Sequence, residues 1–147
     1  MLEPHATRVV AIEATFRHSA GKLGSRFLKA LRDEKRILGW RSGRPERVSV
    51  PPKDLGMDGT WVEVGPGARL EAYAPPDWLR AVGRQADEAD CLALVRLEGA
   101  DTALLARVRR GPHAPHLSIG LRLVARIAER PTGAITDLWF EPAQEER

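Results

Sequence analysis

A series of short β-like segments is the feature that most limits what this chain can fold into. Most of these segments are separated by turns that contain Gly, Pro or Asp. Short strands in close succession are typical of a small closed barrel, in which closure removes the exposed sheet edges. We therefore predict a mainly β protein. The six segments are Thr60–Val64, Ala68–Tyr73, Cys91–Leu97, Thr102–Val108, Arg122–Ala128 and Ile135–Phe140.

The 147 residues suit one small barrel that carries a smaller appendage. A helix is predicted before the barrel, because Phe27, Leu28 and Leu31 recur at helical spacing. Ser25 is its expected N-cap, with Ser19 as the alternative. We divide the chain into an N-terminal arm with the helix (1–36), a segment rich in Gly and Pro (37–60), the barrel (61–142) and a polar tail (143–147).

Charge and cysteine content narrow the functional classes. The formal net charge is +3, from 23 basic and 20 acidic residues, whereas a nucleic-acid module usually concentrates its positive charge more strongly. Cys91 is the single cysteine, so an internal disulfide and a multi-cysteine metal site are both excluded. The sequence has no secretory signal and no run of about 18 apolar residues. We expect a cytoplasmic protein.

Several pieces of the chain, from about Ser19 onward, follow one another in an order and spacing that match a known family. The pieces are Ser19-Ala20-Gly21, Ser25-Arg26-Phe27, Val50-Pro51-Pro52, Trp61-Val62-Glu63-Val64, Leu92-Ala93-Leu94-Val95-Arg96-Leu97-Glu98-Gly99, Ile119-Gly120 and Gly133-Ala134-Ile135-Thr136-Asp137. With them, the chain resembles the zinc-ribbon and OB-fold proteins that accompany thiolase-superfamily enzymes. The resemblance implies that the barrel is an OB-fold and that residues 37–60 form a rubredoxin-like ribbon hairpin.

The metal ligands of that family are missing from this sequence. The resemblance places two cysteine pairs around the Val-Pro-Pro segment, at the positions that Ser42, Pro45, Gly56 and Gly59 occupy here. Structural zinc takes about four Cys or His ligands. We therefore expect a degenerate ribbon without zinc and no other bound cofactor. Apolar packing is then needed to order the segment, and the candidates are Trp40, Val48, Val50, Leu55 and Met57.

The resemblance also implies a function in lipid metabolism. It suggests a non-catalytic accessory subunit that docks on a thiolase, a hydroxymethylglutaryl-CoA synthase or a thiolase-like retro-aldolase as part of a hetero-oligomer. Such a subunit would support binding or transfer of an acyl-CoA that the enzyme acts on. Thioester chemistry needs a thiolate with acid and base groups. This sequence offers no convincing set of them, so we expect the partner to supply the catalytic residues.

Two groups of residues are candidates for binding. Guanidinium groups match phosphate oxygens in bidentate fashion, so arginines near turns are candidates for the phosphates of CoA or for acidic groups of the partner. These arginines are Arg41, Arg44, Arg47, Arg107 and Arg109. A solvated strand face is the alternative interpretation. The candidates for the partner interface are Phe27, Trp40, Val50 and Trp78, with core packing as the alternative.

Other reactive residues have simpler interpretations. Cys91 opens an apolar run, so a small core side chain is favoured over a nucleophile. His113 and His116 lie in a loop with interposed prolines and have no further ligand nearby in sequence, which favours a solvated loop over a metal site. The alternative function is a free-standing OB-fold protein that binds single-stranded nucleic acid, with tryptophans as stacking platforms.

Overall fold

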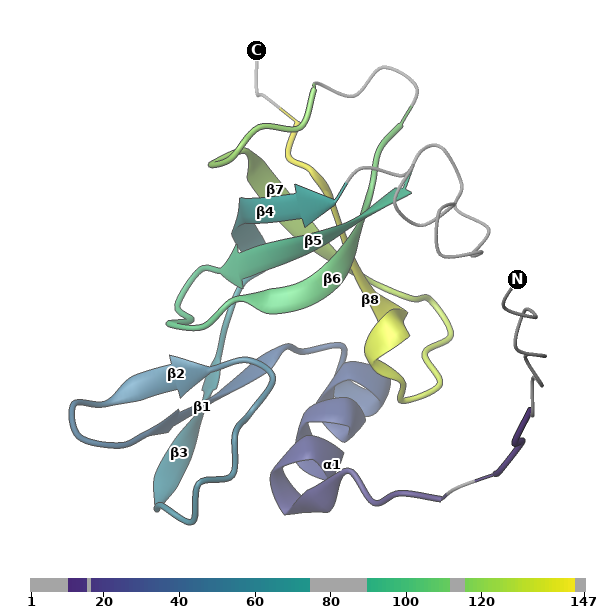
Figure 1. Cartoon of the computed structure of the whole chain (residues 1–147). Coiled ribbons are helices and arrows are strands. Elements are labelled where there is room, and N and C mark those ends of the chain that lie inside the picture. Colours follow the sequence, from purple (N-terminus) through teal and green to yellow (C-terminus); the bar gives the residue numbers. More distant parts are fainter. Residues whose placement is uncertain (1–10, 16, 75–89, 112–115, 145–147) are drawn as a thin grey trace, which may run out of the picture.

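The computed structural model describes residues 11–15, 17–74, 90–111 and 116–144. These described residues form a three-stranded sheet and a five-stranded barrel, with one α-helix packed beside them (Figure 1). Before the barrel come α1 (Gly21–Lys29), β1 (Leu38–Ser42), β2 (Arg47–Ser49) and β3 (Gly59–Glu63). The barrel strands are β4 (Gly67–Ala74), β5 (Asp90–Leu97), β6 (Leu104–Arg109), β7 (Arg122–Ile127) and β8 (Leu138–Pro142).

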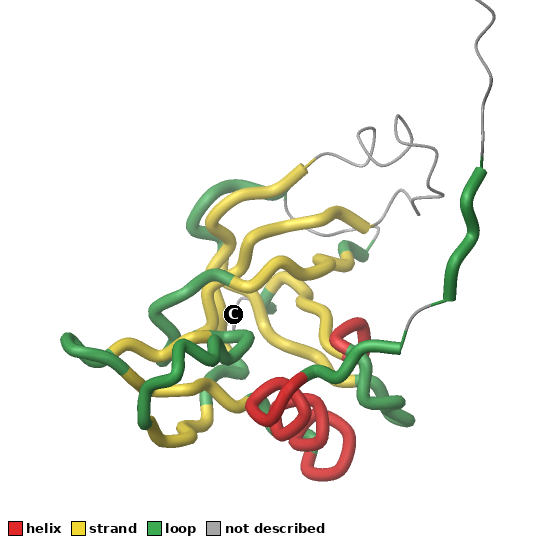
Figure 2. Tube along the Cα trace, turned by 60° about the horizontal axis from the view of Figure 1, so that its bottom comes forward, coloured by secondary structure: helices red, strands yellow, loops and turns green. Residues whose placement is uncertain are grey.

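The barrel has the strand order of an OB-fold. Its order is β4-β5-β6-β8-β7, and β4 pairs with β7 to close it. Neighbouring strands are antiparallel except β6 and β8, which meet in parallel at Val108 and Phe140. Figure 2 shows the strands curving around the barrel axis, with the helix and the three-stranded sheet at one end. The predicted class, a mainly β protein with a barrel preceded by a helix, is confirmed.

The core runs continuously from the barrel into the helix and the smaller sheet. Alternate residues of each barrel strand point inward, as the two-residue period of a strand requires. Helix α1 adds Phe27, and the π-helical turn that follows it adds Leu31; both are almost completely buried. The largest fully buried side chains are Phe27, Phe140, Leu31, Leu70, Leu97, Leu123, Val50, Val95, Val108 and Cys91.

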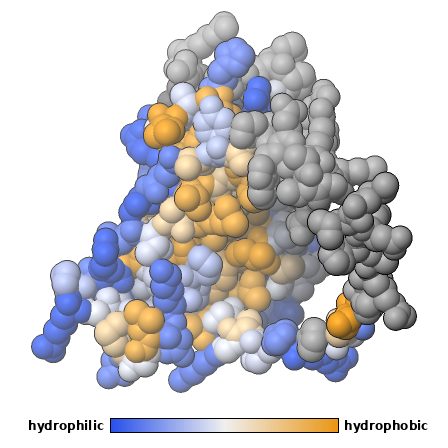
Figure 3. Space-filling view, in the orientation of Figure 1, coloured by the Kyte–Doolittle hydropathy of each residue, from blue (hydrophilic) through white to orange (hydrophobic). Residues whose placement is uncertain are grey.

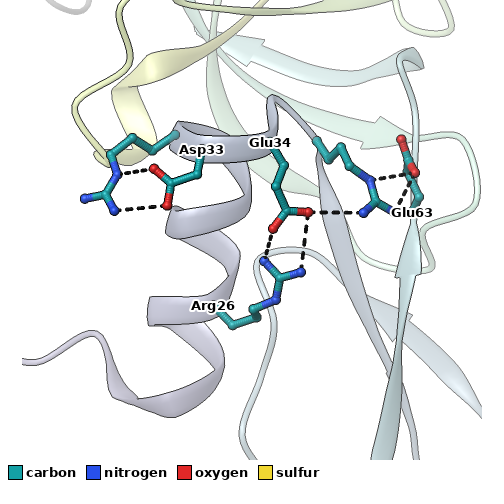
Figure 4. Close-up of polar contacts among 6 residues, drawn as sticks. Arg26, Asp33, Glu34 and Glu63 are labelled. Atoms are coloured by element: carbon teal, nitrogen blue, oxygen red, sulfur yellow. Dashed lines mark hydrogen bonds and ion pairs between the residues drawn. The ribbon is translucent and has the colours of Figure 1, made fainter.

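The helix begins earlier than expected. It starts at Gly21, and the Gly21 amide donates to the hydroxyl of Ser19 at 3.1 Å, so Ser25 is not the N-cap. The helical segment ends at Lys35, whose φ of 50° breaks the helical geometry. Just beyond it, Arg36 binds both Glu34 and Glu63, and Glu34 also binds Arg26 (Figure 4). These ion pairs join the helix to strand β3, but they are solvent-exposed and contribute little individually.

The three-stranded sheet differs in two ways from the sequence prediction. Strand β1 was not predicted, although it is the central strand, with β2 and β3 antiparallel on either side. Strand β3, which the division at residue 61 splits between ribbon and barrel, pairs over its whole length with β1. Its register with β1 therefore places it in the smaller sheet. The barrel strands begin at Gly67.

Two barrel strands begin later than predicted, because polar side chains just before each strand form hydrogen bonds with other parts of the chain. Thr102, the first residue of the predicted strand, instead accepts from the Val50 amide just after β2, and the neighbouring Asp101 accepts from the Val48 amide of β2. Ile135 to Asp137 form a single 3-10 turn before β8.

No helix in the ranges that the structure describes is long and apolar enough to cross a membrane.

Asp137 organises the connection between β7 and β8. It is one of two buried polar residues in the described part of the chain. Its carboxylate accepts hydrogen bonds from the backbone amides of Thr132, Gly133 and Ala134, at 2.7 to 3.0 Å. Burial alone would raise the pKa of Asp137, but these hydrogen bonds, with one from the Thr132 hydroxyl, lower it below the ordinary value of 3.8. The charged form therefore stabilises the fold.

We expect Asp137→Asn to lower the free energy of unfolding by about 1–3 kcal/mol at neutral pH, because a charged acceptor is lost. The Asp137 carboxyl is more acidic in the folded than in the unfolded protein, so its stabilisation is present above its unfolded pKa near 3.8 and is lost as pH falls through the lower folded value. Urea unfolding between pH 7 and pH 3 measures this difference. The exposed Asp58→Asn is the control. A wild-type advantage that stays constant down to pH 3 would contradict the assignment.

Candidate functional site

The outer face of strands β4, β5 and β6 is the candidate interaction surface. Alternate residues of these strands point into the barrel, which leaves the others on its outside. The register joins Ala72, Leu94 and Leu105 into one cross-strand row, and Leu94 and Leu105 are 40% and 58% exposed. The next row joins Ala74 to Leu92 and Arg107. We call these six residues the outer face.

A β-bulge in β4 gives the outer face its apolar composition. The pairing of β4 with β5 shifts between Leu70 and Ala72, so that Leu70 remains buried while Ala72 lies beside exposed Leu94. The extra residue, Glu71, binds Arg96 on the neighbouring strand. A bulge changes the side of the strand on which the following residues lie. Without this shift, Ala72 and Ala74 would point into the barrel and Tyr73 would point outward.

Ion pairs border the outer face at both ends. At one end Arg96 binds Glu71 and the carbonyl of Asp101. At the other end Arg107 lies 3.3 Å from Asp90. The charges at these borders are already matched within the chain. A partner can therefore cover the apolar rows without neutralising an isolated charge, which favours burial of this face.

Figure 3 shows apolar side chains gathered across the barrel side that β5 and β6 present in the view of Figure 1, with hydrophilic side chains around them. A row of exposed aliphatic residues, with the partly buried Leu92 and Ala74 beside it, is uncommon on a sheet that only meets water, because one face of an antiparallel sheet is normally polar. Continuous apolar patches mark interaction surfaces more often than single exposed residues do.

The two barrel arginines predicted to bind CoA have partners in this structure. Arg107 is paired with Asp90, and the guanidinium of Arg109 lies 4.3 Å from the ring centre of Trp139. The Trp139 indole also donates to Glu141 at 3.1 Å. This hydrogen bond, together with the nearby Arg126, lowers the pKa of Glu141. Both predicted arginines thus make contacts with other residues of the barrel strands.

The three ribbon arginines are all exposed but do not converge on one face. Arg41 pairs in register with Val48, while Arg47 pairs with Ser42 one residue further along. Adjacent positions of a strand point to opposite faces, so Arg41 and Arg47 lie on opposite sides of the sheet. Arg44 lies in the exposed turn between β1 and β2. A phosphate site that uses all three therefore has no support in this geometry.

The predicted partner residues fall into three groups. Phe27 and Val50 are 2% and 1% exposed, so they belong to the protein's own core and offer almost no area to a partner. Trp40 is half-buried and packs edge-on against Trp61, with ring centres 4.9 Å apart. Trp78 lies outside the described residues.

The four positions implied as metal ligands do not fit a metal. Strand pairing sets Ser42 opposite Gly59, so the two turns that would carry ligands do meet. A serine hydroxyl, a proline ring and two glycines provide none of the thiolate or imidazole donors that structural zinc prefers. Within the described ranges, no group of three or more His, Cys, Asp or Glu side chains is arranged to hold a metal. His113 lies outside those ranges, and His116 is exposed.

Cys91 is a core residue. It is 1% exposed and lies on the inward side of β5. Burial raises the pKa of the Cys91 thiol, and the nearby positive charge of Arg110 only partly opposes this. A buried thiol with a raised pKa is a poor nucleophile at neutral pH.

Of the outer face, only Arg107 was predicted as a binding residue, and the aliphatic residues were not predicted as a site. The signal was present, because the run Cys91-Leu92-Ala93-Leu94-Val95 is apolar at consecutive positions, and consecutive strand residues lie on opposite faces. In the middle of β5, from Cys91 to Val95, both faces are therefore apolar. The run predicts a core position for Cys91 but does not by itself predict the exposure of Leu94. The outward position of Leu105, however, follows only from the pairing of β6 with β5.

Comparisons with known proteins support the fold. No family model matches the sequence, and no curated protein matches it significantly. Among solved structures, a chain of the Ltp2-ChsH2(DUF35) aldolase aligns with a TM-score of 0.60 at 18% identity, covering 86% of this chain and 98% of that one. A protein of unknown function from the DUF35 family of Sulfolobus solfataricus aligns with a TM-score of 0.55 at 17% identity, covering 84% and 85%.

The burial of Cys91 predicts a protected thiol. In native protein, modification of Cys91 by an aromatic disulfide reagent should be roughly a hundredfold slower, or more, than in urea-unfolded protein, because it needs local opening. The matched control is Cys91→Ala combined with Ser118→Cys, which places the single thiol on an exposed loop and should react quickly. Equal rates for the native and unfolded wild type would show that Cys91 is accessible.

Proposed function

We propose that this protein is a non-catalytic accessory subunit that docks on a thiolase-superfamily enzyme and supports binding or transfer of its acyl-CoA substrate. The composition of the outer face carries the proposal. OB-folds commonly bind ligands on the face of their second and third strands, which are β5 and β6 here. In this chain that face presents aliphatic side chains, with Leu94 and Leu105 the most exposed.

The same face argues for a protein partner over single-stranded nucleic acid. Nucleic-acid OB-folds stack bases on aromatic side chains within a basic groove. The outward residues of β5 are Asp90, Leu92, Leu94 and Arg96, and none is aromatic. The three described tryptophans also have contacts within the chain, Trp40 with Trp61 and Trp139 with Arg109. The nucleic-acid alternative therefore has no specific observation in its favour.

The type of partner is suggested by the shared fold. One of the aligned structures is the Ltp2-ChsH2(DUF35) aldolase, so a chain of this fold occurs in an aldolase whose name joins two components, Ltp2 and ChsH2. The buried Cys91 thiol is unsuited to thioester chemistry, which is consistent with a partner that supplies the catalytic groups. We place the complex in the cytoplasm, in the metabolism of acyl-CoA lipids. An obligate interface of this kind buries about 2,000 Å² or more in total.

The ribbon arginines are the best remaining candidates for contact with CoA. Arg41, Arg44 and Arg47 are exposed. Arg47 and Trp40 lie on the same face of the smaller sheet by register, whereas Arg44 lies in the turn beyond them. We propose that Arg44 and Arg47 face the phosphates of CoA or an acidic surface of the enzyme once the complex forms.

Purification of the tagged chain from its own host tests the proposal directly. We expect a thiolase-superfamily enzyme to co-elute in a fixed ratio at moderate salt, and mass spectrometry identifies it. An apolar interface should persist when salt is raised, whereas phosphate-driven nucleic-acid binding weakens steeply. Recovery of the chain alone, or only with nucleic acid that salt removes, would overturn the accessory-subunit proposal.

Substitutions on the outer face locate the interface. Leu94→Glu combined with Leu105→Glu should weaken the complex roughly a hundredfold or more, because charges would be buried without partners. Ile135→Glu is the matched control, since Ile135 is 42% exposed but lies in the connection between β7 and β8. Pull-down and analytical ultracentrifugation measure binding, and thermal unfolding checks the fold. A double variant that still binds like wild type would place the interface elsewhere, while leaving the accessory role intact.

A further inference from the structure

We infer that the indole of Trp40, seated on Gly59, occupies the place that a metal ligand would need, so that the three-stranded sheet is ordered by packing in place of a metal. This inference concerns the smaller sheet and does not depend on the proposed partner. It starts from strand pairing, which brings the two turns of the ribbon together. Trp40, Arg41 and Ser42 of β1 lie opposite Trp61, Thr60 and Gly59 of β3.

The space above Gly59 is filled by Trp40. A Cβ atom added at residue 59 would lie 2.7 and 2.8 Å from the Cε2 and Cζ2 atoms of Trp40, and it would also collide with the carbonyl oxygen of Arg41. Carbon atoms pack at about 3.5–4.0 Å, so no side chain fits at residue 59 while the indole keeps its position. A cysteine ligand at residue 59 and the observed position of Trp40 are mutually exclusive.

Neighbouring apolar residues complete this packing. The Trp61 ring meets Trp40 edge-on, at an interplanar angle of 63°. The Met57 methyl lies 3.8 Å from where a Cβ of Gly43 would be, so Met57 reaches across from the second turn to the first. Of the other residues expected to hold the segment, Val48 and Val50 are buried, but Leu55 is 68% exposed and that expectation was wrong.

The opposite face of the sheet is fixed to the barrel. A Cβ at Gly39 would lie 2.5 Å from Val48 and 3.3 Å from Val50, which shows how closely these valines cover β1. The Val48 and Val50 amides donate to the Asp101 carboxylate and the Thr102 hydroxyl, at 2.8 and 2.9 Å. One face of the sheet is thus held by the barrel and the other by the Trp40 packing. Both contacts are made by side chains and backbone of this chain.

Metal analysis and a chelator give the first test. We expect the full chain, purified without added metal, to contain substoichiometric zinc, and its thermal midpoint to be the same with and without phenanthroline. A structural zinc contributes directly to folding, so its removal lowers the midpoint. Stoichiometric zinc, or a midpoint that falls with chelator, would overturn the inference.

A double-mutant cycle gives the second test and isolates the indole. Gly59→Ala should raise the unfolding equilibrium constant roughly tenfold or more, because it overpacks the site. In a Trp40→Ala background, Gly59→Ala should raise the unfolding equilibrium constant by a factor at least about threefold smaller, because the clash with the indole is removed while the clash with the Arg41 carbonyl remains. Gly111→Ala is the control, since no atom lies within 4 Å of its Cβ position.

The cycle stays informative if Trp40→Ala does not fold. In that case Trp40→Phe replaces it, because a smaller ring should reduce the cost of Gly59→Ala in the same direction. Near-ultraviolet circular dichroism reports the Trp40–Trp61 contact in each variant. A cost of Gly59→Ala that is the same in every Trp40 background would show that the indole does not fill the site.

Discussion

Four hydrogen bonds join the edge strand of the smaller sheet to the turn between β5 and β6. The Val48 amide donates to the Asp101 carboxylate and the Asp101 amide donates to the Val48 carbonyl, while Thr102 both accepts from and donates to the backbone of Val50. A side chain here completes the pairing of a strand that would otherwise end with free amides. The position of the smaller sheet on the barrel depends on this junction, and so does the burial of the two valines.

The junction orders the smaller sheet through hydrogen bonds to the barrel. In a zinc ribbon the ligands hold two turns together from within. In this chain the barrel holds β2 from one side, and Trp40 packs over Gly59 on the other. Packing of this kind depends on shape, since a methyl group added at residue 59 would collide with both the Trp40 indole and the Arg41 carbonyl oxygen.

The outer face shows how a common fold acquires a different surface. The barrel topology is that of an OB-fold, and a bulge in β4 sets which residues face outward beyond Leu70. Function resides in the site and not in the fold. Here aliphatic rows replace the aromatic platforms of nucleic-acid binders, while matched ion pairs such as Arg107 with Asp90 supply a polar border. This composition suits a protein partner.

The sequence by itself determined the parts of the structure that local patterns encode. The strands of the barrel, the helix around Phe27, the core position of Cys91 and the missing ligand set could all be predicted, because periodicity and residue chemistry act over a few neighbouring residues. The helix start was placed wrongly, since two serines offered similar caps and the structure uses neither as the N-cap residue.

Only the tertiary structure decided which face each strand presents and what lies on it. The pairing of β3 with β1, the outward row of Leu94 and Leu105, and the opposite faces of Arg41 and Arg47 all depend on strand register. Register is set by contacts between residues far apart in sequence, and a shift of one residue exchanges the two faces of a strand. The sequence gives the residues of each strand, but their neighbours on the adjacent strands follow only from the tertiary structure.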